Sequence, residues 1–181
     1  MFTQEEIRIA NATYRSKGSS VFDKNGNIRS VVARFVANHI PKDLKILDFG
    51  CGSEFIQGKY LRELGFDVSG WDFGDNKPKE CVDKLEKIYD VVYASNVLNV
   101  ISSHSMLMET LNQIRGCLKD GGMFIANYPQ SPRKMKISGQ ELGDIIKEQT
   151  DMDFYKLEGT SCPMWIFFKF NEKIECLNVG A

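Results

Sequence analysis

Residues that commonly bind metal ions or build disulfide frameworks are scarce or badly spaced in this chain. Its 181 residues include only two histidines, and its cysteines are odd in number, widely spaced and without a Cys-x-x-Cys pair. The cysteines are Cys51, Cys81, Cys117, Cys162 and Cys176. This usage predicts neither a zinc site nor a disulfide-built fold, and it favours a reducing, cytoplasmic setting.

Long apolar runs and an excess of charge of one sign are also missing. No apolar run approaches 18 residues, and Glu5 and Glu6 stand where a signal peptide needs basic residues. We therefore expect neither secretion nor a membrane span. The formal net charge is −1, so no global field favours nucleic acid, although a local basic patch could still serve.

The length suits one domain better than two. With 43% hydrophobic and 26% charged residues, the chain has the composition of a soluble globular protein. We predict a single domain over residues 1–181, with the core in 43–181 and an N-terminal helix and lid in 1–30.

Helical and strand patterns alternate along the sequence. Apolar spacing predicts helices over Thr3–Tyr14, Val31–Ile40, Phe55–Leu64, Cys81–Lys87, Ser105–Leu118 (closed by Gly121 and Gly122) and Gln140–Glu148. Short apolar runs predict strands over Lys45–Phe49, Phe66–Trp71, Tyr89–Ala94, Met123–Ala126, Asp153–Leu157 and Trp165–Phe170. Such alternation predicts a doubly wound α/β fold, a mostly parallel sheet with helices on both faces. The last two strands have no helix between them, which predicts an antiparallel C-terminal edge strand.

A glycine-rich turn follows the first expected strand. In sheets of this class, ligands bind beyond the carboxyl ends of the strands, where the strand order changes direction. Asp48 ends the strand, and Gly50 and Gly52 would let the turn tighten and a ligand lie against the backbone. Asp72, at the end of the second strand, is placed to accept hydrogen bonds from both ribose hydroxyls.

A dinucleotide site fits this turn less well. Its Gly-x-Gly-x-x-Gly pattern needs a glycine at Phe55. The carboxylate of Asp48 would also repel a pyrophosphate, whereas it suits a cationic amino-acid cofactor.

Four segments in order and at fitting distances form a specific combination: Asp48–Gly52, Gly70–Asp72, Tyr89–Val92 and Leu118–Ile125. They resemble the first motif, the ribose-binding strand end, the fourth strand and the fifth-strand segment of class I S-adenosylmethionine-dependent methyltransferases. The resemblance spans Asp43–Asn127. The stretch Ser95–Val100 also resembles small phage-borne and DNA-modification-associated methyltransferases.

The resemblance implies a Rossmann-like fold, S-adenosyl-L-methionine as cofactor and methyl transfer to an acceptor that could be a small molecule, a nucleotide or nucleic acid. Asp48 would position the amino-acid end of the cofactor, Gly50 and Gly52 would form its floor, and Cys51 is favoured as a small packing residue of that loop. The residues expected at the cofactor are Asp48, Gly50, Cys51, Gly52, Asp72, Phe73, Val82, Asn96 and Arg15.

Two departures from the family pattern concern the cofactor. Glu54 stands where the first motif has a third glycine, which predicts a less open turn. Only 17 residues separate Asp72 from Asp90, so the third strand of the family must be very short or missing. The nearest candidates for an adenine contact are then Cys81, Val82 and Asp83.

The acceptor is expected beyond Tyr89–Ala94. Asn96 could hydrogen-bond an acceptor or cap the turn after this strand, and both readings stay open. His104 could act as a general base, although a surface position before a helix capped by Ser102, Ser103 or Ser105 is favoured. A charged sulfonium donor needs mainly alignment of the reactants, so a base is optional.

Two DNA-directed chemistries lack their motifs. Asn96 is followed by Val97 and Leu98, not by the Pro-Pro-aromatic triplet of amino-methylating DNA enzymes. The Pro-Cys nucleophile of cytosine-C5 enzymes is also absent, since Cys162 and Pro163 have the reverse order.

Basic residues gather in one place. Arg133, Lys134 and Lys136 could contact the phosphate of a substrate, although a solvated basic loop is the favoured interpretation. Near the N-terminus, Arg15 with Tyr14 and Lys17 would form the lid, and Arg15 could pair with the cofactor carboxylate.

Two other functions compete with catalysis. A protein with this fold could bind S-adenosylmethionine without catalysis, as a partner or regulatory subunit. A nicotinamide-dependent oxidoreductase is the third and least favoured hypothesis.

Overall fold

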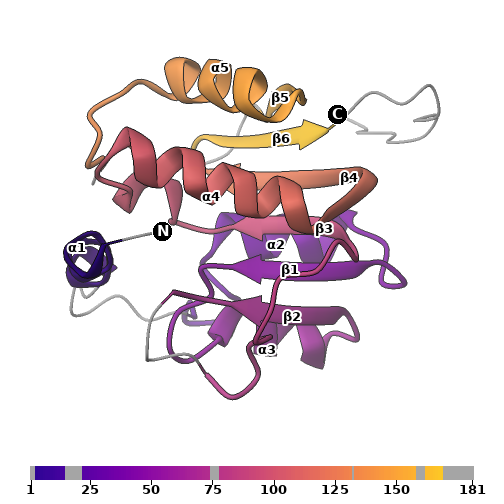
Figure 1. The fold of residues 1–181 in the computed structure, drawn as a ribbon. Helices are drawn as coiled ribbons and strands as arrows, with labels where there is room; N and C mark the ends of the chain where they lie inside the picture. The colour runs from indigo at the N-terminus through magenta and orange to yellow at the C-terminus, as the bar shows by residue number, and fades with distance from the viewer. Residues whose placement is uncertain (1–2, 15–21, 74–77, 132, 158–161, 169–181) are drawn as a thin grey trace.

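A single six-stranded sheet lies between two pairs of helices (Figure 1). The computed structural model describes residues 3–14, 22–73, 78–131, 133–157 and 162–168. The strands are β1 (Lys45–Phe49), β2 (Asp67–Trp71), β3 (Tyr89–Ala94), β4 (Leu118–Asn127), β5 (Asp153–Leu157) and β6 (Met164–Phe168). Their order across the sheet is β2-β1-β3-β4-β6-β5.

Strands β1 to β4 run parallel, and the last two strands run antiparallel to their neighbours. β6 pairs antiparallel with both β4 and β5, which puts β5 at the edge of the sheet. The predicted mostly parallel sheet with an antiparallel C-terminal edge is therefore confirmed.

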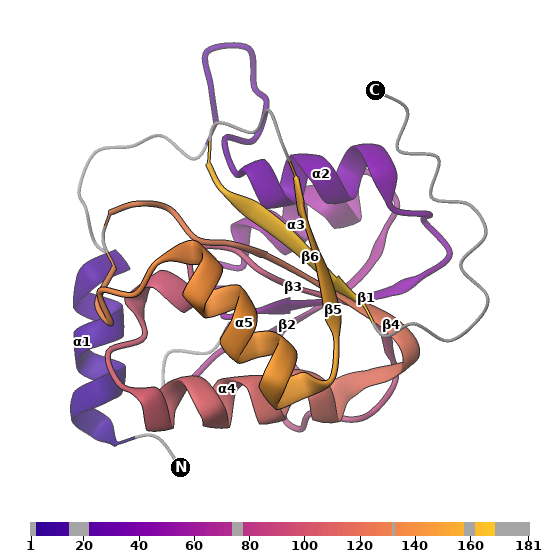
Figure 2. The same cartoon turned by 90° about the horizontal axis from the view of Figure 1, so that it is seen from above.

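The two faces of the sheet carry separate apolar cores. Helices α2 (Val31–His39) and α3 (Ile56–Glu63) cover one face, and α4 (His104–Cys117) and α5 (Gly139–Thr150) cover the other (Figure 2). Successive strand residues point to opposite faces, so Ile46 joins the core under α2 and α3, whereas its neighbour Leu47 joins the core under α4 and α5.

Serine side chains begin three of these helices. Ser30, Ser103 and Ser138 each accept a hydrogen bond from a backbone amide of the first turn, which satisfies one of the amides that a helix start leaves unpaired. Ser103 is thus the cap of α4 among the three serines that the sequence offered. The predicted closure of this helix by Gly121 and Gly122 is wrong, because the chain passes directly from Cys117 into β4.

The predicted helix over Cys81–Lys87 is also wrong. The segment forms turns and one isolated parallel bridge, between Cys81 and Gly70, and Val82 N donates to Gly70 O at 2.9 Å. This bridge is what the structure has in place of a third parallel strand, so the expectation of a very short or missing strand is confirmed. The apolar residues of the segment, Val82 and Leu85, pack half-buried against the core under α4.

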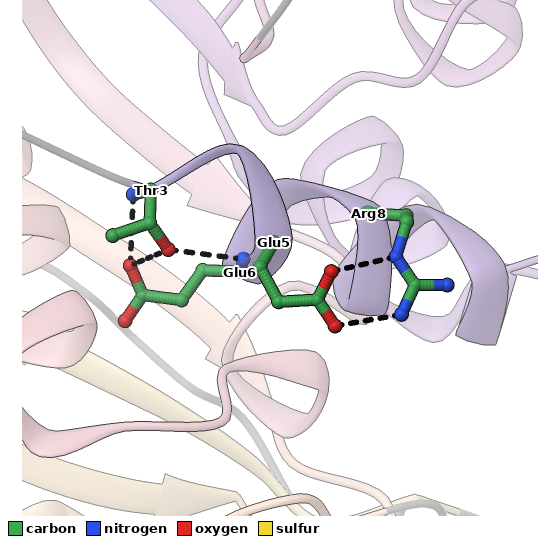
Figure 3. Close-up of polar contacts among 4 residues, drawn as sticks. All are labelled: Thr3, Glu5, Glu6 and Arg8. Carbon is green, nitrogen blue, oxygen red and sulfur yellow. Dashed lines mark hydrogen bonds and ion pairs between the residues drawn. The ribbon is translucent and has the colours of Figure 1, made fainter.

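Helix α1 (Gln4–Tyr14) lies apart from the layers, against the short 3-10 helix η1 (Leu98–Val100) that follows β3. A reciprocal cap begins it: Glu6 N donates to Thr3 Oγ1, while Thr3 N donates to Glu6 Oε2 (Figure 3). The other carboxylate oxygen of Glu6 accepts a hydrogen bond from Ser103 Oγ. One glutamate therefore closes the helix start and fastens α1 to the start of α4.

Two helical glycines should respond oppositely to alanine. A Cβ at Gly58 would lie 1.9 Å from the buried ring of Phe55, whereas one at Gly116 would meet nothing within 4 Å. We predict that Gly58→Ala lowers the free energy of unfolding by about 1–3 kcal/mol through overpacking. Gly116→Ala should raise it by roughly 0.4–1 kcal/mol. Urea unfolding checks both, and a neutral Gly58→Ala would contradict the packing of Phe55 on α3.

Candidate functional site

The strand order places a crevice between the carboxyl ends of β1 and β3. The chain leaves β1 toward β2 on one side and returns to β3 on the other side of β1. Because the connections that leave these two strands run to opposite sides, a space stays open beyond the carboxyl ends of the strands. Open α/β sheets bind ligands in this space. The glycine-rich turn follows β1 and Asn96 follows β3, so both predicted segments border this crevice.

The turn after β1 is fixed by hydrogen bonds to the end of β2. Gly50 N and Cys51 N both donate to Trp71 O, at 2.7 and 3.1 Å. Gly50 and Gly52 have φ angles of +76° and +72°, a region that favours glycine. A Cβ at Gly50 would also lie 2.5 Å from Val97 Cγ2. Glycine at position 50 thus meets both a backbone requirement and a close approach of the loop after β3.

Asp72 completes this arrangement. Its carboxylate accepts from Gly52 N through Oδ2 and from Phe73 N through Oδ1, the latter at 2.6 Å. Each carboxylate oxygen can accept a second hydrogen bond, so two hydroxyls of a ligand could be accommodated in addition to these amides. The Phe73 ring packs edge-on against Phe49 at 5.5 Å, which anchors the backbone that follows Asp72.

Asp48 lies behind the turn, on the face covered by α3. It is 1% exposed, and burial is the main cause that raises its pKa to about 7. The nearby Tyr93 hydroxyl and Gly58 amide oppose this rise, and the charge of Asp72 adds to it. Asp48 therefore supports the turn from below, and its contact with a cofactor stays a prediction.

Glu54 does not fill the turn in which it replaces a glycine. Its side chain is exposed, and with Ser53 it borders a groove of about 420 Å³ over the outer side of α3, opposite Phe22 and Tyr60. The following Phe55 takes the left-handed backbone conformation and buries its ring. The exposed position of Glu54 therefore does not support the expectation that this residue makes the turn less open.

The end of β3 is joined to the end of β4 by an amide pair. Asn96 N donates to Asn127 Oδ1 at 2.6 Å, and Asn127 Nδ2 donates back to Asn96 Oδ1 at 2.9 Å. Asn96 is exposed with φ +59°, whereas Asn127 is only 3% exposed. Sequence reasoning missed Asn127; the signal was a polar residue ending β4 beside the polar residue that follows β3.

The positions of the other predicted residues assign them no role in the site. His104 is exposed as the first residue of α4, which agrees with the favoured surface interpretation. Val82 is half-buried and packs, as Phe73 does, against the core under α4, and Asp83 is exposed. Arg15 and Lys17 lie outside the described residues, as does the side chain of Tyr14.

The basic cluster is tied to its own loop. Arg133 donates from Nε to Pro129 O at 2.9 Å and from Nη2 to Tyr128 O at 3.1 Å, and its guanidinium lies 4.3 Å from the centroid of the Tyr128 ring. Lys134 and Lys136 are exposed. Two of the three cations thus face solvent, while the third holds the loop after β4 in place.

A family model described as a methyltransferase domain matches residues 22–159. The chain belongs to this family. The match takes in both borders of the crevice and strands β1 to β5, while β6 lies just beyond it, so the methyltransferase domain is the fold described above. The predicted family and fold class are confirmed, and the specific likeness to phage-borne enzymes stays a prediction.

A curated relative in Haemophilus influenzae bears the name "Probable S-adenosyl-L-methionine-dependent methyltransferase TehB". It is 30% identical over 107 residues, a match that covers 52% of this chain and 35% of the relative. The matched part of this chain therefore spans about a third of the length of that protein. Its name contains the cofactor that the sequence predicts.

Solved structures of methyltransferases share the fold. A TehB-like S-adenosylmethionine-dependent methyltransferase from Corynebacterium glutamicum has a TM-score of 0.60 at 18% identity, covering 81% of this chain and 91% of that one. CalS10, an amino pentose methyltransferase from Micromonospora echinaspora solved with S-adenosylmethionine bound, has 0.58 at 14% identity, covering 94% and 98%. At these identities the likeness shows the fold alone.

Within the described ranges, no three His, Cys, Asp or Glu side chains gather as a metal ion would require. Among the helices described there, none combines the length and apolar character needed to cross a membrane.

The buried carboxyl of Asp48 should make stability depend on pH. With a pKa of about 7 in the folded protein and an ordinary value of 3.8 when unfolded, Asp48 retains a proton in the folded state that the unfolded chain loses. Stability from this group therefore falls as pH rises from about 4 to about 7. Above pH 7 the loss approaches roughly 4 kcal/mol.

We predict that Asp48→Asn gains stability relative to wild type over this pH range. Urea unfolding at pH 4, 5.5, 7 and 8 measures the difference, with Asp67→Asn, exposed at the start of β2, as the matched control. Parallel pH profiles for Asp48→Asn and wild type would contradict a buried carboxyl with a raised pKa.

Proposed function

We propose that this chain transfers a methyl group from S-adenosyl-L-methionine to a small-molecule acceptor. The observation that carries the proposal is the hydrogen-bonded turn of Gly50 and Gly52 beside Asp72. It places two glycines next to a carboxylate at the point where the strand order changes direction. Family membership supports the reaction class, and the buried and half-buried acids favour a cofactor that carries positive charge.

The residues present fit this cofactor. Gly50 and Gly52 offer a backbone surface with no Cβ, and Asp72 would accept the ribose hydroxyls. Asp48 would lie beneath the amino-acid end, where the positive charge of the cofactor would favour its ionised form. When bound, S-adenosyl-L-methionine supplies a methyl group made electrophilic by the positive sulfur. The half-buried segment at Val82 would border the adenine in place of the missing third strand.

The work left to the protein is alignment and exclusion of water. Asn127 holds Asn96 in its left-handed conformation through both of its amide atoms. Asn96 Nδ2 is the group that would then meet an acceptor. Helix α1, fastened through Glu6 to Ser103, lies beside η1 at this end of the sheet and would limit the entry of water.

Three observations favour a small acceptor. Arg133 uses two donors on carbonyls of its own loop, and the chain has a net charge of only −1. The fold neighbours CalS10 and the sugar N-methyltransferase KedS8 are named for carbohydrate acceptors. A phosphate-bearing acceptor held by Lys134 and Lys136 is the weaker proposal, and a non-catalytic role has no observation in its favour.

Loss of Asp72 should weaken cofactor binding. A hydrogen bond to a charged group contributes about 1.5–3 kcal/mol, so Asp72→Ala should raise the Kd for S-adenosylhomocysteine by about tenfold to a hundredfold. Asp67→Ala, at the opposite, exposed end of the same strand, should leave it unchanged. Calorimetry measures both, and equal affinities in the two variants would mean that the ribose is held elsewhere.

The acceptor class can be tested with cofactor that carries a tritiated methyl group. We expect label to enter the small-metabolite fraction of a cell extract and not purified DNA or RNA. Asn96→Ala should lower this transfer at least tenfold while the Kd for S-adenosylhomocysteine stays within twofold, because Asn96 is proposed to face the acceptor. Lys134→Gln with Lys136→Gln should transfer like wild type. Label in nucleic acid, or loss of transfer in the lysine variant, would favour the phosphate-bearing acceptor.

A further inference from the structure

Two thiols meet beside the glycine-rich turn. Cys51 Sγ lies 3.3 Å from Cys81 Sγ, and each cysteine is partly exposed. A disulfide bond is about 2.05 Å long, so the two sulfurs are only about 1.3 Å farther apart than in a covalent bridge. The two residues stand 30 positions apart in the sequence, which is why their spacing gave no sign of a pair.

The missing third strand and a glycine in β2 bring these thiols together. Cys81 sits in the isolated bridge beside Gly70, where a regular strand would otherwise run on. Cys51 reaches across Gly70: a Cβ there would lie 3.0 Å from Cys51 Sγ. Any other residue at position 70 would crowd Cys51 Sγ and the ring of Phe55.

We propose that Cys51 and Cys81 form a reversible intramolecular disulfide that acts on the cofactor turn. No other cysteine among the described residues is so placed: Cys117 is buried under α4, and Cys162 lies near Asn127 at the end of β4. The modification itself rests on the thiol pair alone. Its effect on cofactor affinity rests on the function proposed above.

The oxidation requires a peroxide, and its steps balance. Burial and the nearby Asp48 raise the pKa of the Cys51 thiol, which disfavours its thiolate, so the first step is assigned to Cys81. Cys81 sulfur takes one peroxide oxygen as the O–O bond breaks, which gives a sulfenic acid and one water. Cys51 sulfur then attacks Cys81 sulfur, the S–O bond breaks, and the hydroxyl leaves with the Cys51 proton as a second water. A dithiol reverses the bridge by exchange.

The bridge should disturb the turn that binds the cofactor. Cys51 lies between Gly50 and Gly52, and its amide shares Trp71 O with that of Gly50. Drawing Cys51 toward Cys81 shifts the turn relative to Asp72, which accepts from Gly52 N. We expect the oxidised protein to bind S-adenosylhomocysteine about tenfold more weakly than the reduced protein.

The experiment compares the 181-residue chain reduced with dithiothreitol, treated with hydrogen peroxide, and reduced again. Peptide mapping locates the disulfide, and calorimetry measures the Kd for S-adenosylhomocysteine in each state. The expected result is a Cys51–Cys81 peptide, about tenfold weaker binding, and full recovery on reduction. In Cys51→Ser and in Cys81→Ser, peroxide should leave the Kd that each variant has in the reduced state unchanged, whereas Cys117→Ser should respond like wild type.

The outcomes separate the two proposals. Peroxide treatment that yields no Cys51–Cys81 peptide would overturn the modification site. A bridge that leaves the Kd within twofold would overturn its effect on the turn. If the reduced protein itself binds no S-adenosylhomocysteine, the proposed function fails, while the mapping still decides whether the disulfide forms.

Discussion

The junction between the turn after β1 and the end of β2 is the contact on which the rest of the site depends. Trp71 O accepts hydrogen bonds from two backbone amides of the turn, and the carboxylate of the next residue, Asp72, accepts one from a third amide. Because these bonds fix the turn, Gly50 can approach Val97 closely enough to exclude any side chain at position 50. The turn, the acid proposed to bind the ribose and the loop after β3 are thus held by one small set of contacts.

A second joint orders the other side of the crevice. The amide pair between Asn96 and Asn127 links the ends of β3 and β4, and Arg133 fastens the loop that follows β4 to its own carbonyls. The proposed cofactor and acceptor regions therefore have separate supports on neighbouring strands.

Much of the fold follows from local patterns, and the failures occur where tertiary contacts decide. Buried parallel strands have short, nearly continuous apolar sequences, so the predicted bounds of β1, β2 and β3 agree with the structure almost to the residue. The glycine-rich turn between Asp48 and Asp72 follows from the same pattern. The apolar spacing of Val82 and Leu85 imitates a helix, but it arises from packing on the core beside a single strand bridge. Asn127 and the thiol pair became visible only when strands distant in sequence were placed side by side.

The most direct test of the account is a crystal structure of the chain with S-adenosylhomocysteine. The account predicts the ribose hydroxyls within hydrogen-bonding distance of the Asp72 carboxylate and the amino-acid end of the ligand over the backbone of Gly50 and Gly52. A ligand bound elsewhere, or a ribose held by residues other than Asp72 while the turn stays as described, would contradict it.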